Sequence, residues 1–199
     1  MKKAILVAER GAMLLKDLQP ELYFEIPNPE TPLPEDMELV TITNGVFSAG
    51  AAFILLHEVG HQYYDHLSYW PEDDVAKQEE FDADQYAADW FKRGLGVNTV
   101  LDNTATNGVM AAMLTLLLMH KDLKGGDRHP DPDVRILKVL DHLGRPDDDL
   151  MWIVGAFGLP MWTATHSSIT DLDDGGHHDS ERSIFVSALK RILAQTKTD

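Results

Sequence analysis

The stretch Ile54–Leu67, with the sequence ILLHEVGHQYYDHL, is the part of the chain around which the predicted fold is organised. It contains His57, Glu58 and His61 in the pattern H-E-x-x-H. On an α-helix two histidines four residues apart lie one turn above each other, so both imidazoles can hold one zinc ion. The glutamate after the first histidine then stands beside the water that such an ion activates and can act as general base. The stretch therefore predicts a helix with two metal ligands and a catalytic carboxylate.

Composition indicates a globular protein that buries a core of its own. The chain has 199 residues, of which 44% are hydrophobic, and it most economically forms one domain over residues 1–199. We expect the main part of that domain at about residues 38–143 and a C-terminal helical extension at about residues 149–196. The 33 acidic and 17 basic residues give a formal charge of −16, which repels phosphates and therefore argues against a nucleic-acid partner.

Cysteine content and apolar runs bear on the compartment. There is no cysteine, so disulfides and thiolate zinc sites are excluded. The N-terminal sequence MKKAILVAER breaks its short apolar run with two charged residues, so no secretory signal is predicted. The longest uninterrupted apolar run, Val109–Met119, is well short of the roughly 20 residues that span a bilayer. We expect a cytoplasmic protein without membrane insertion, and the sequence does not indicate its oligomeric state.

The first part of the chain is predicted to contain a helix and a small sheet. Apolar residues recur at helical spacing between residues 3 and 18. Residues 22–26 are aromatic and aliphatic and lead into a proline-rich loop, which indicates a strand. Residues 38–43 (ELVTIT) alternate and are rich in β-branched side chains, and Asn44-Gly45 follows as a turn. Together these segments predict a small antiparallel sheet.

The rest of the chain is predicted to be helical. Ser48 is a plausible N-cap for the helix that carries the histidines, while Pro132 suits the first turn of a later helix and Gly144 its end. The predicted fold class is α+β, a mostly helical single domain with a small N-terminal antiparallel sheet and a zinc site between two helices. The predicted helices cover residues 49–67, 75–91, 108–123, 132–142, 150–165 and 184–193.

A catalytic zinc site normally needs a third protein ligand and a position open to water. The helix predicted at 75–91 supplies Glu80, with Asp84 one turn further on. Two antiparallel helices joined by a short turn would let Glu80 face the metal, while Asp84 accepts a hydrogen bond from a ligand imidazole and fixes its tautomer. One residue of helix phase decides which carboxylate points inward, so Glu79, Asp82 and Asp84 remain alternatives for the third ligand.

The sequence H-E-V-G-H followed by E-F-D-A-D-Q-Y-A resembles the gluzincin metalloproteases, whose signature is H-E-x-x-H with a downstream E-x-x-A-D or E-x-x-x-D. The most similar are the HtpX-like proteases and the small soluble minigluzincins, which include Lit-like and ImmA/IrrE-like peptidases. His66 matches the extra histidine that HtpX-like proteins often carry five residues after the second ligand. His129-Pro130 with Arg135-Ile136 resembles their H-P-x-x-x-x-R-I segment, and the resemblance covers roughly residues 38–143.

This resemblance implies a zincin-like fold and a soluble zinc-dependent endopeptidase that acts on a protein or peptide substrate. Gluzincin-like enzymes bind the substrate as an extra strand of a sheet, and here that strand would pair with residues 38–43. HtpX-like enzymes have transmembrane helices, which favours the soluble relatives, whereas the ImmA/IrrE group usually has Asn in place of Asp84. The implied site residues are the zinc ligands His57, His61 and Glu80, the general base Glu58 and the supporting carboxylate Asp84.

Further polar residues have both a structural and a functional interpretation. His129 is either a loop residue or one that approaches the metal or the oxyanion, and Arg135 is either a buried ion-pair partner or a substrate clamp. For His66 we favour a structural role at the C-terminus of the helix, where its charge suits the helix dipole, over a catalytic role. The doublet His177-His178 more often would be a solvated loop than a second cation site. Tyr63 and Tyr64 are expected to pack, although a tyrosine hydroxyl can stabilise an oxyanion.

Two other functions are compatible with the same residues. The first is a metal-bound regulatory or binding module without proteolytic activity, and the intact Glu58 counts against it. The second is a zinc hydrolase of a non-peptide substrate, because ligands and a base do not by themselves specify an amide bond.

Overall fold

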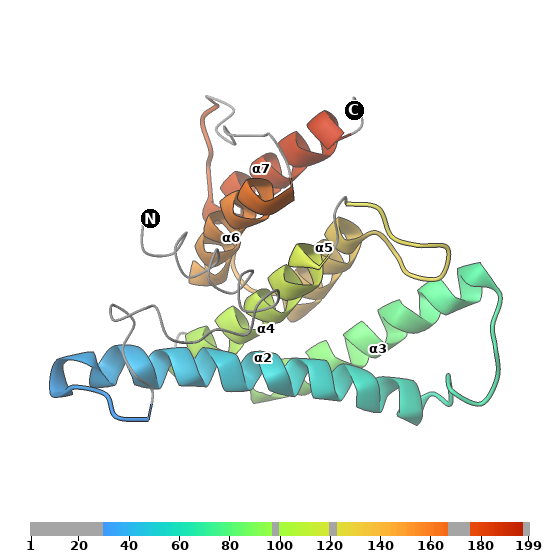
Figure 1. Cartoon of the computed structure of the whole chain (residues 1–199), viewed down its shortest axis with the longest axis horizontal. Helices are drawn as coiled ribbons and strands as arrows, with labels where there is room; N and C mark the ends of the chain where they lie inside the picture. Colours follow the sequence, from blue (N-terminus) through green and yellow to red (C-terminus); the bar gives the residue numbers. More distant parts are fainter. Residues whose placement is uncertain (1–29, 97–99, 120–122, 167–175, 197–199) are drawn as a thin grey trace.

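The computed structural model describes residues 30–96, 100–119, 123–166 and 176–196 (Figure 1). These residues form helices and connecting loops, and none of them lies in a strand. The elements are the short 3-10 helix η1 (Pro34–Asp36) and the α-helices α2 (Met37–Tyr63), α3 (Asp73–Gly94), α4 (Val100–Leu118), α5 (Pro132–Leu143), α6 (Leu150–His166) and α7 (Glu181–Thr196).

The predicted antiparallel sheet is wrong for the described part of the chain, and the fold there is helical rather than α+β. Residues 38–43 and the Asn44-Gly45 pair lie inside α2, which continues without a break from Met37 to Tyr63. The β-branched side chains favour a strand only weakly, whereas packing of a long helix against its neighbours stabilises the helix. The helix expected at 3–18 and the strand expected at 22–26 lie outside the described residues.

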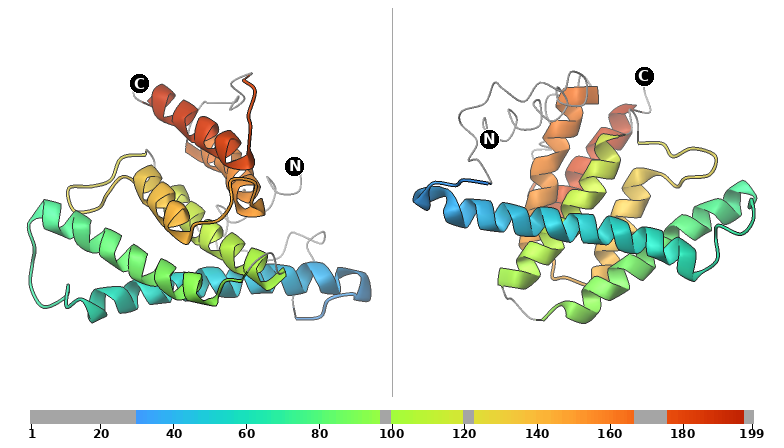
Figure 2. Two further views of the ribbon diagram at one scale, coloured as in Figure 1. Left: turned by 180° about the vertical axis from the view of Figure 1, so that it is seen from behind. Right: turned by 60° about the horizontal axis from the view of Figure 1, so that its bottom comes forward.

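Small residues allow α2 and α4 to pack closely, which explains why this part of the chain is helical. A Cβ atom added at Gly45 would lie 2.7 Å from the side chain of Thr104. One added at Gly108 would lie 2.4 Å from the Cβ of Ala49 and 2.9 Å from the backbone nitrogen of Gly50. The two backbones therefore approach at a distance that only glycine permits, and α2 lies across α4 in the views of Figure 2.

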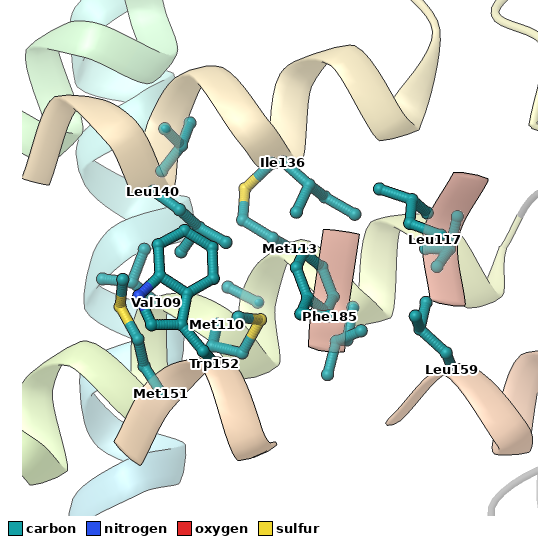
Figure 3. Close-up of a cluster of buried hydrophobic side chains, with 14 of the residues drawn as sticks. Val109, Met110, Met113, Leu117, Ile136, Leu140, Met151, Trp152, Leu159 and Phe185 are labelled. Atoms are coloured by element: carbon teal, nitrogen blue, oxygen red, sulfur yellow. The ribbon is translucent and has the colours of Figure 1, made fainter. Parts of the chain in front are cut away.

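The hydrophobic core is centred on α4 (Figure 3). Met110, Met113 and Leu117 of this helix are almost completely buried. α6 packs on α4 from the side opposite to α2, and α7 packs on α6 (Figure 1). Side chains of both C-terminal helices belong to the buried cluster, so these helices share this core. The other large buried side chains of the cluster come from α5, α6 and α7 and are Ile136, Leu140, Met151, Trp152, Leu159, Leu189, Ile192, Trp162 and Phe185.

The later helix boundaries agree with the sequence signals more closely than the first ones. Pro132 begins α5, and Gly144 ends it in the left-handed conformation (φ 66°), with its N–H donating to the carbonyl oxygen of Asp141. α6 has nearly the predicted bounds, and it continues through Pro160, where an interruption was expected. By contrast, α4 begins at Val100, whereas the prediction began at residue 108. The prediction missed the first two turns because they are polar and lack an apolar stripe.

α2 is more apolar than run lengths suggested. By length and composition alone, the helical segment Pro34–Tyr63 could cross a membrane. Of its most apolar 18 residues, 11% are buried inside the protein. The expectation that no segment is long enough to span a bilayer is therefore wrong. It counted only uninterrupted apolar runs, whereas α2 contains isolated polar residues and is still apolar on average. A mostly buried core helix of a soluble protein passes the same test, whereas α2 packs against α3 and α4 along part of its surface and leaves most of its apolar side chains exposed. The absence of membrane insertion stays a prediction.

Candidate metal centre

The two histidines of the H-E-x-x-H motif face α3 because α2 and α3 cross closely at Gly60. A Cβ atom added to Gly60 would lie 3.0 Å from the Cα of Ala83, so any larger residue would separate the helices. This contact brings the first half of α3 against the last turns of α2. His57 and His61, one turn apart on α2, therefore lie opposite Glu80 of α3.

The atoms of His57, His61 and Glu80 are spaced as metal ligands. The two Nε2 atoms are 3.1 Å apart, and each lies 3.7 Å from a carboxylate oxygen of Glu80. In a tetrahedral zinc site with metal–ligand distances near 2.1 Å, neighbouring ligand atoms are about 3.4 Å apart. The three residues therefore fit a single zinc ion, and one ligand atom from each lies within 4.8 Å of the others.

A buried network holds two of these residues from behind. Asp84 places Oδ1 2.9 Å from Nδ1 of His57, the ring nitrogen that faces away from the other histidine. The guanidinium group of Arg135 donates to both oxygens of Asp84, at 2.8 and 2.7 Å, and its Nη1 lies 2.8 Å from Oε2 of Glu80. Arg135 thus links α5 to both carboxylates of α3. It is a buried ion-pair partner, the structural one of its two predicted roles.

The electrostatics of this network favour a charged pair beside a neutral histidine. Burial raises the pKa of Asp84, but the contacts with His57 and Arg135 outweigh burial and hold the pKa below its usual value. Burial lowers the pKa of Arg135, and its bonds to Asp84 outweigh that and raise it. Burial and the neighbouring His57 lower the pKa of His61. His61 is therefore neutral at neutral pH, the form in which imidazole binds a metal.

The alternative carboxylates point elsewhere. Glu79 is buried, and its Oε1 accepts a hydrogen bond from the hydroxyl of Tyr69. Asp82 accepts a hydrogen bond from Nε2 of Gln78 on its own helix, at 2.8 Å. Among the described residues, the group of potential metal ligands consists of the two histidines with Glu80.

The His–His–Glu group opens into a cleft of about 680 Å³. Glu58 is exposed and lines this cleft beside the two histidines. His129 is at the opening, with a side chain that is 62% exposed and an Nδ1 atom 3.4 Å from Oε1 of Glu80. Apolar side chains of α2, of α4 and of the residue that follows α4 form much of the remaining wall, among them Phe53, Ile54, Ala112, Met113, Leu116 and Met119.

Other predicted candidates lie outside the cleft. Tyr63 and Tyr64 pack on Tyr86 of α3, with ring centroids 5.1 and 6.1 Å away, and neither lines the cleft. His177 contacts Asp179 near the start of α7 and is almost fully exposed. Neither it nor His178 belongs to a group of potential metal ligands among the described residues.

Sequence patterns missed three residues that shape the cleft. Arg128 stacks its guanidinium group 4.0 Å from the ring centre of Trp70 and donates to the carbonyl oxygen of Pro71 at 2.7 Å. These contacts join the loop after α2 to the loop before α5, and all three residues line the cleft. No signal in the sequence predicts them, because the partners are far apart along the chain and lie in no periodic segment.

A helix with H-E-x-x-H that faces a glutamate on a second helix, within an open cleft, is the arrangement of an H-E-x-x-H peptidase site. Comparison with protein families supports a peptidase in general, because the model of the family Peptidase U49 matches residues 2–155. The chain belongs to the Peptidase U49 family, which supports a peptidase activity, and thus a hydrolase. No curated protein and no solved structure matches the chain. The closer resemblance to HtpX-like, Lit-like or ImmA/IrrE-like proteins stays a prediction.

Proposed function

We propose that this peptidase is a zinc-dependent endopeptidase, with His57, His61 and Glu80 as the zinc ligands and Glu58 as the general base. The observation that supports this most strongly is the spacing of the ligand atoms, 3.1 and 3.7 Å, in an open cleft that Glu58 also lines. When bound, the ion supplies a Lewis acid that polarises the scissile carbonyl group and acidifies the attacking water.

The residues of the chain have separate tasks in this proposal. Glu58 removes the proton of the attacking water and later donates it to the leaving amine. Asp84 holds the ring of His57 through Nδ1, so that Nε2 points into the cleft. Arg135 neutralises the negative charge that Glu80 and Asp84 bring into a buried place. His129, at the opening of the cleft, is the nearest candidate donor to the oxyanion of the tetrahedral intermediate.

The substrate is bound differently from the sequence-based expectation. Residues 38–43 belong to α2, so they offer no strand edge with which a peptide could pair. We place the peptide instead in the cleft, between the apolar side chains of α2 and α4 on one side and the loop with His129 on the other. Affinity then comes from burial of apolar side chains rather than from main-chain pairing.

The proposal is tested by the metal content and the activity of matched variants. Glu58→Gln should retain zinc at the wild-type stoichiometry and lose cleavage of an unfolded protein substrate by about 10²-fold or more, because proton transfer by a positioned base contributes that much. Glu80→Ala should lose zinc, whereas Glu79→Ala should keep it, since Glu79 is bonded to Tyr69 instead. Metal analysis of purified proteins and gel-based cleavage assays measure both.

Two outcomes would overturn parts of this proposal. A wild-type protein without zinc, or full cleavage by Glu58→Gln, would reject the zinc mechanism. Wild-type protein that holds zinc yet cleaves nothing across a proteome-wide digest would favour the regulatory or binding module.

A further inference from the structure

The C-terminal end of α2 has a backbone conformation that returns the chain toward His61. Asp65 is in the left-handed region with φ 59°, and is the one non-glycine residue with positive φ in the described part of the chain. The N–H of His66 donates to the carbonyl oxygen of His61 at 3.0 Å, and that of Asp65 to the carbonyl oxygen of Gln62 at 3.2 Å. This pair of bonds is the Schellman motif, which ends many helices but usually has glycine at the left-handed position.

The motif places the ring of His66 against the ring of His61. In a Schellman motif the residue after the left-handed one contacts the third residue from the helix end, and these two positions are His66 and His61. Their Nδ1 atoms are 3.0 Å apart, and the rings meet edge to face with centroids 5.2 Å apart. The ring of Tyr64 also stacks on that of His66, with centroids 5.5 Å apart and planes at 22°.

The contact fixes which nitrogen of His61 is free to bind a metal. Nε2 of His61 faces Nε2 of His57, so the remaining nitrogen, Nδ1, carries the proton when Nε2 is a ligand. That N–H needs an acceptor, and Nδ1 of His66 lies at hydrogen-bonding distance. His57 has the equivalent support from the carboxylate of Asp84. Each of the two ligand histidines is thus held through its outer nitrogen, one by a carboxylate and one by an imidazole.

We propose that His66 is a positioning residue, which accepts the hydrogen bond of His61 Nδ1 and so directs His61 Nε2 into the metal centre. The proposal rests on the proposed zinc site. It replaces the interpretation of His66 as a charge that suits the helix dipole. It also gives the unfavourable backbone of Asp65 a function, because this conformation is what turns His66 back onto the ligand.

Two variants of His66 separate these interpretations. His66→Phe keeps a flat ring that can stack on Tyr64 but has no acceptor. His66→Asn has no ring, yet its side-chain oxygen can occupy nearly the position of Nδ1 and accept the bond. Both variants are uncharged, so loss of a favourable charge at the helix end would affect them equally. His177→Phe, at an almost fully exposed histidine, is the control for the loss of any histidine.

The measurement is the zinc dissociation constant from competition with a chromophoric chelator, together with the absorption spectrum of the cobalt-substituted protein and the melting temperature of the metal-free protein. Removal of a partner that orients a ligand typically weakens metal binding by about 10- to 100-fold. We expect that loss and an altered cobalt spectrum for His66→Phe, affinity within about threefold of wild type for His66→Asn by the same reasoning, and no change for His177→Phe.

Each other outcome decides against the proposal. Wild-type affinity in His66→Phe would show that the hydrogen bond does not support the ligand. Equal weakening of both His66 variants with a lower melting temperature would assign His66 to the helix end alone. If the wild-type protein binds no zinc, the proposed function fails and this inference fails with it, whereas binding by wild type and His66→Phe alike rejects only the inference.

Discussion

At the scale of single residues, Arg135 connects the parts of the candidate centre that come from different helices. Its guanidinium group contacts Glu80 and Asp84, and Asp84 in turn contacts His57. A buried and a half-buried carboxylate so close together would repel each other without a cation between them. Arg135 therefore allows a ligand and the support of another ligand to be placed one helical turn apart on α3.

The pKa of Asp84 predicts how stability depends on pH. Its value in the folded protein is below the usual one, so the ionised carboxylate contributes stability above the pKa of the unfolded chain, near 3.9. That contribution is lost as the pH falls through the lower, folded-state pKa. Asp84→Asn should reduce the free energy of unfolding at pH 7 by about 1–3 kcal/mol, because it removes the charged acceptor of two hydrogen bonds from buried Arg135 and leaves Glu80 as the ion-pair partner of Arg135.

The same variant should lose less stability than wild type when the pH is lowered from about 5 to 3, the range that brackets the carboxylate pKa. Urea unfolding of the metal-free proteins at several pH values measures both effects. Asp82→Asn is the control, since the hydrogen bond of Asp82 described here is an exposed one, with Gln78 on the same helix. Parallel stability curves for wild type and Asp84→Asn would contradict the assignment.

Sequence patterns predicted which residues meet in this candidate centre, but not the contacts that hold them in place. Helical spacing places His57 and His61 on one face, and the next helix offers Glu80 with a phase that differs by one residue from its alternatives. The structure brings these three together, although their roles stay predictions. The contact of His66 with His61 could not be predicted, because it depends on the left-handed backbone of Asp65, and aspartate adopts that conformation far less often than glycine.

At the scale of elements, the main difference between sequence and structure lies in α2. Residues 38–43 have strand-like composition, and Asn44-Gly45 is a common turn pair. Both preferences amount to small free energies, which the packing of Gly45, Ala49 and Gly50 on α4 overrides. α5 was predictable because it has an apolar stripe together with clear start and end signals, Pro132 and Gly144. The start of α4 was not, because its first turns are polar.

Gly108 provides a test of this helix contact. A Cβ atom there would meet Ala49, the carbonyl oxygen of Val46 and the backbone of Gly50 within 2.4–2.9 Å. Backbone atoms cannot move aside as a flexible side chain can, so α2 and α4 must separate. Gly108→Ala should lower the free energy of unfolding by about 1–3 kcal/mol. It should also weaken zinc binding, because α2 carries both histidines.

The matched control is Gly94→Ala, in the last turn of α3, where an added Cβ meets nothing within 4 Å. Alanine has the higher helix propensity, so this variant should be neutral or more stable by up to about 1 kcal/mol. Thermal unfolding and chelator competition measure the two variants side by side. Equal stability of Gly108→Ala and wild type would show that α2 is not held against α4 at this point.

At the scale of the whole molecule, the C-terminal helices and the metal centre share one core through α4. Met110 and Met113 of α4 belong to the same buried cluster as Phe185 and Ile192 of α7, and Met113 also lines the cleft. Arg182 adds a polar link, since Nη2 donates to Asp141 of α5 at 2.8 Å. The model of the Peptidase U49 family ends at residue 155, within α6, so the buried cluster extends beyond the matched residues.

This shared core predicts that α7 stabilises the helices of the candidate site, although no residue of α7 lines the cleft. Phe185 is fully buried and its ring lies 5.8 Å from that of Trp152, so Phe185→Ala should cost about 3–5 kcal/mol of unfolding free energy. Because α4 transmits this loss to α2 and α3, unfolding should remain one transition, at the same midpoint by circular dichroism and by tryptophan fluorescence. Phe157→Ala, at a ring that is 62% exposed on α6, should change the midpoint little. Two separate transitions in Phe185→Ala would instead show that the C-terminal pair folds as a unit of its own, in which case the core of the peptidase would end with α5.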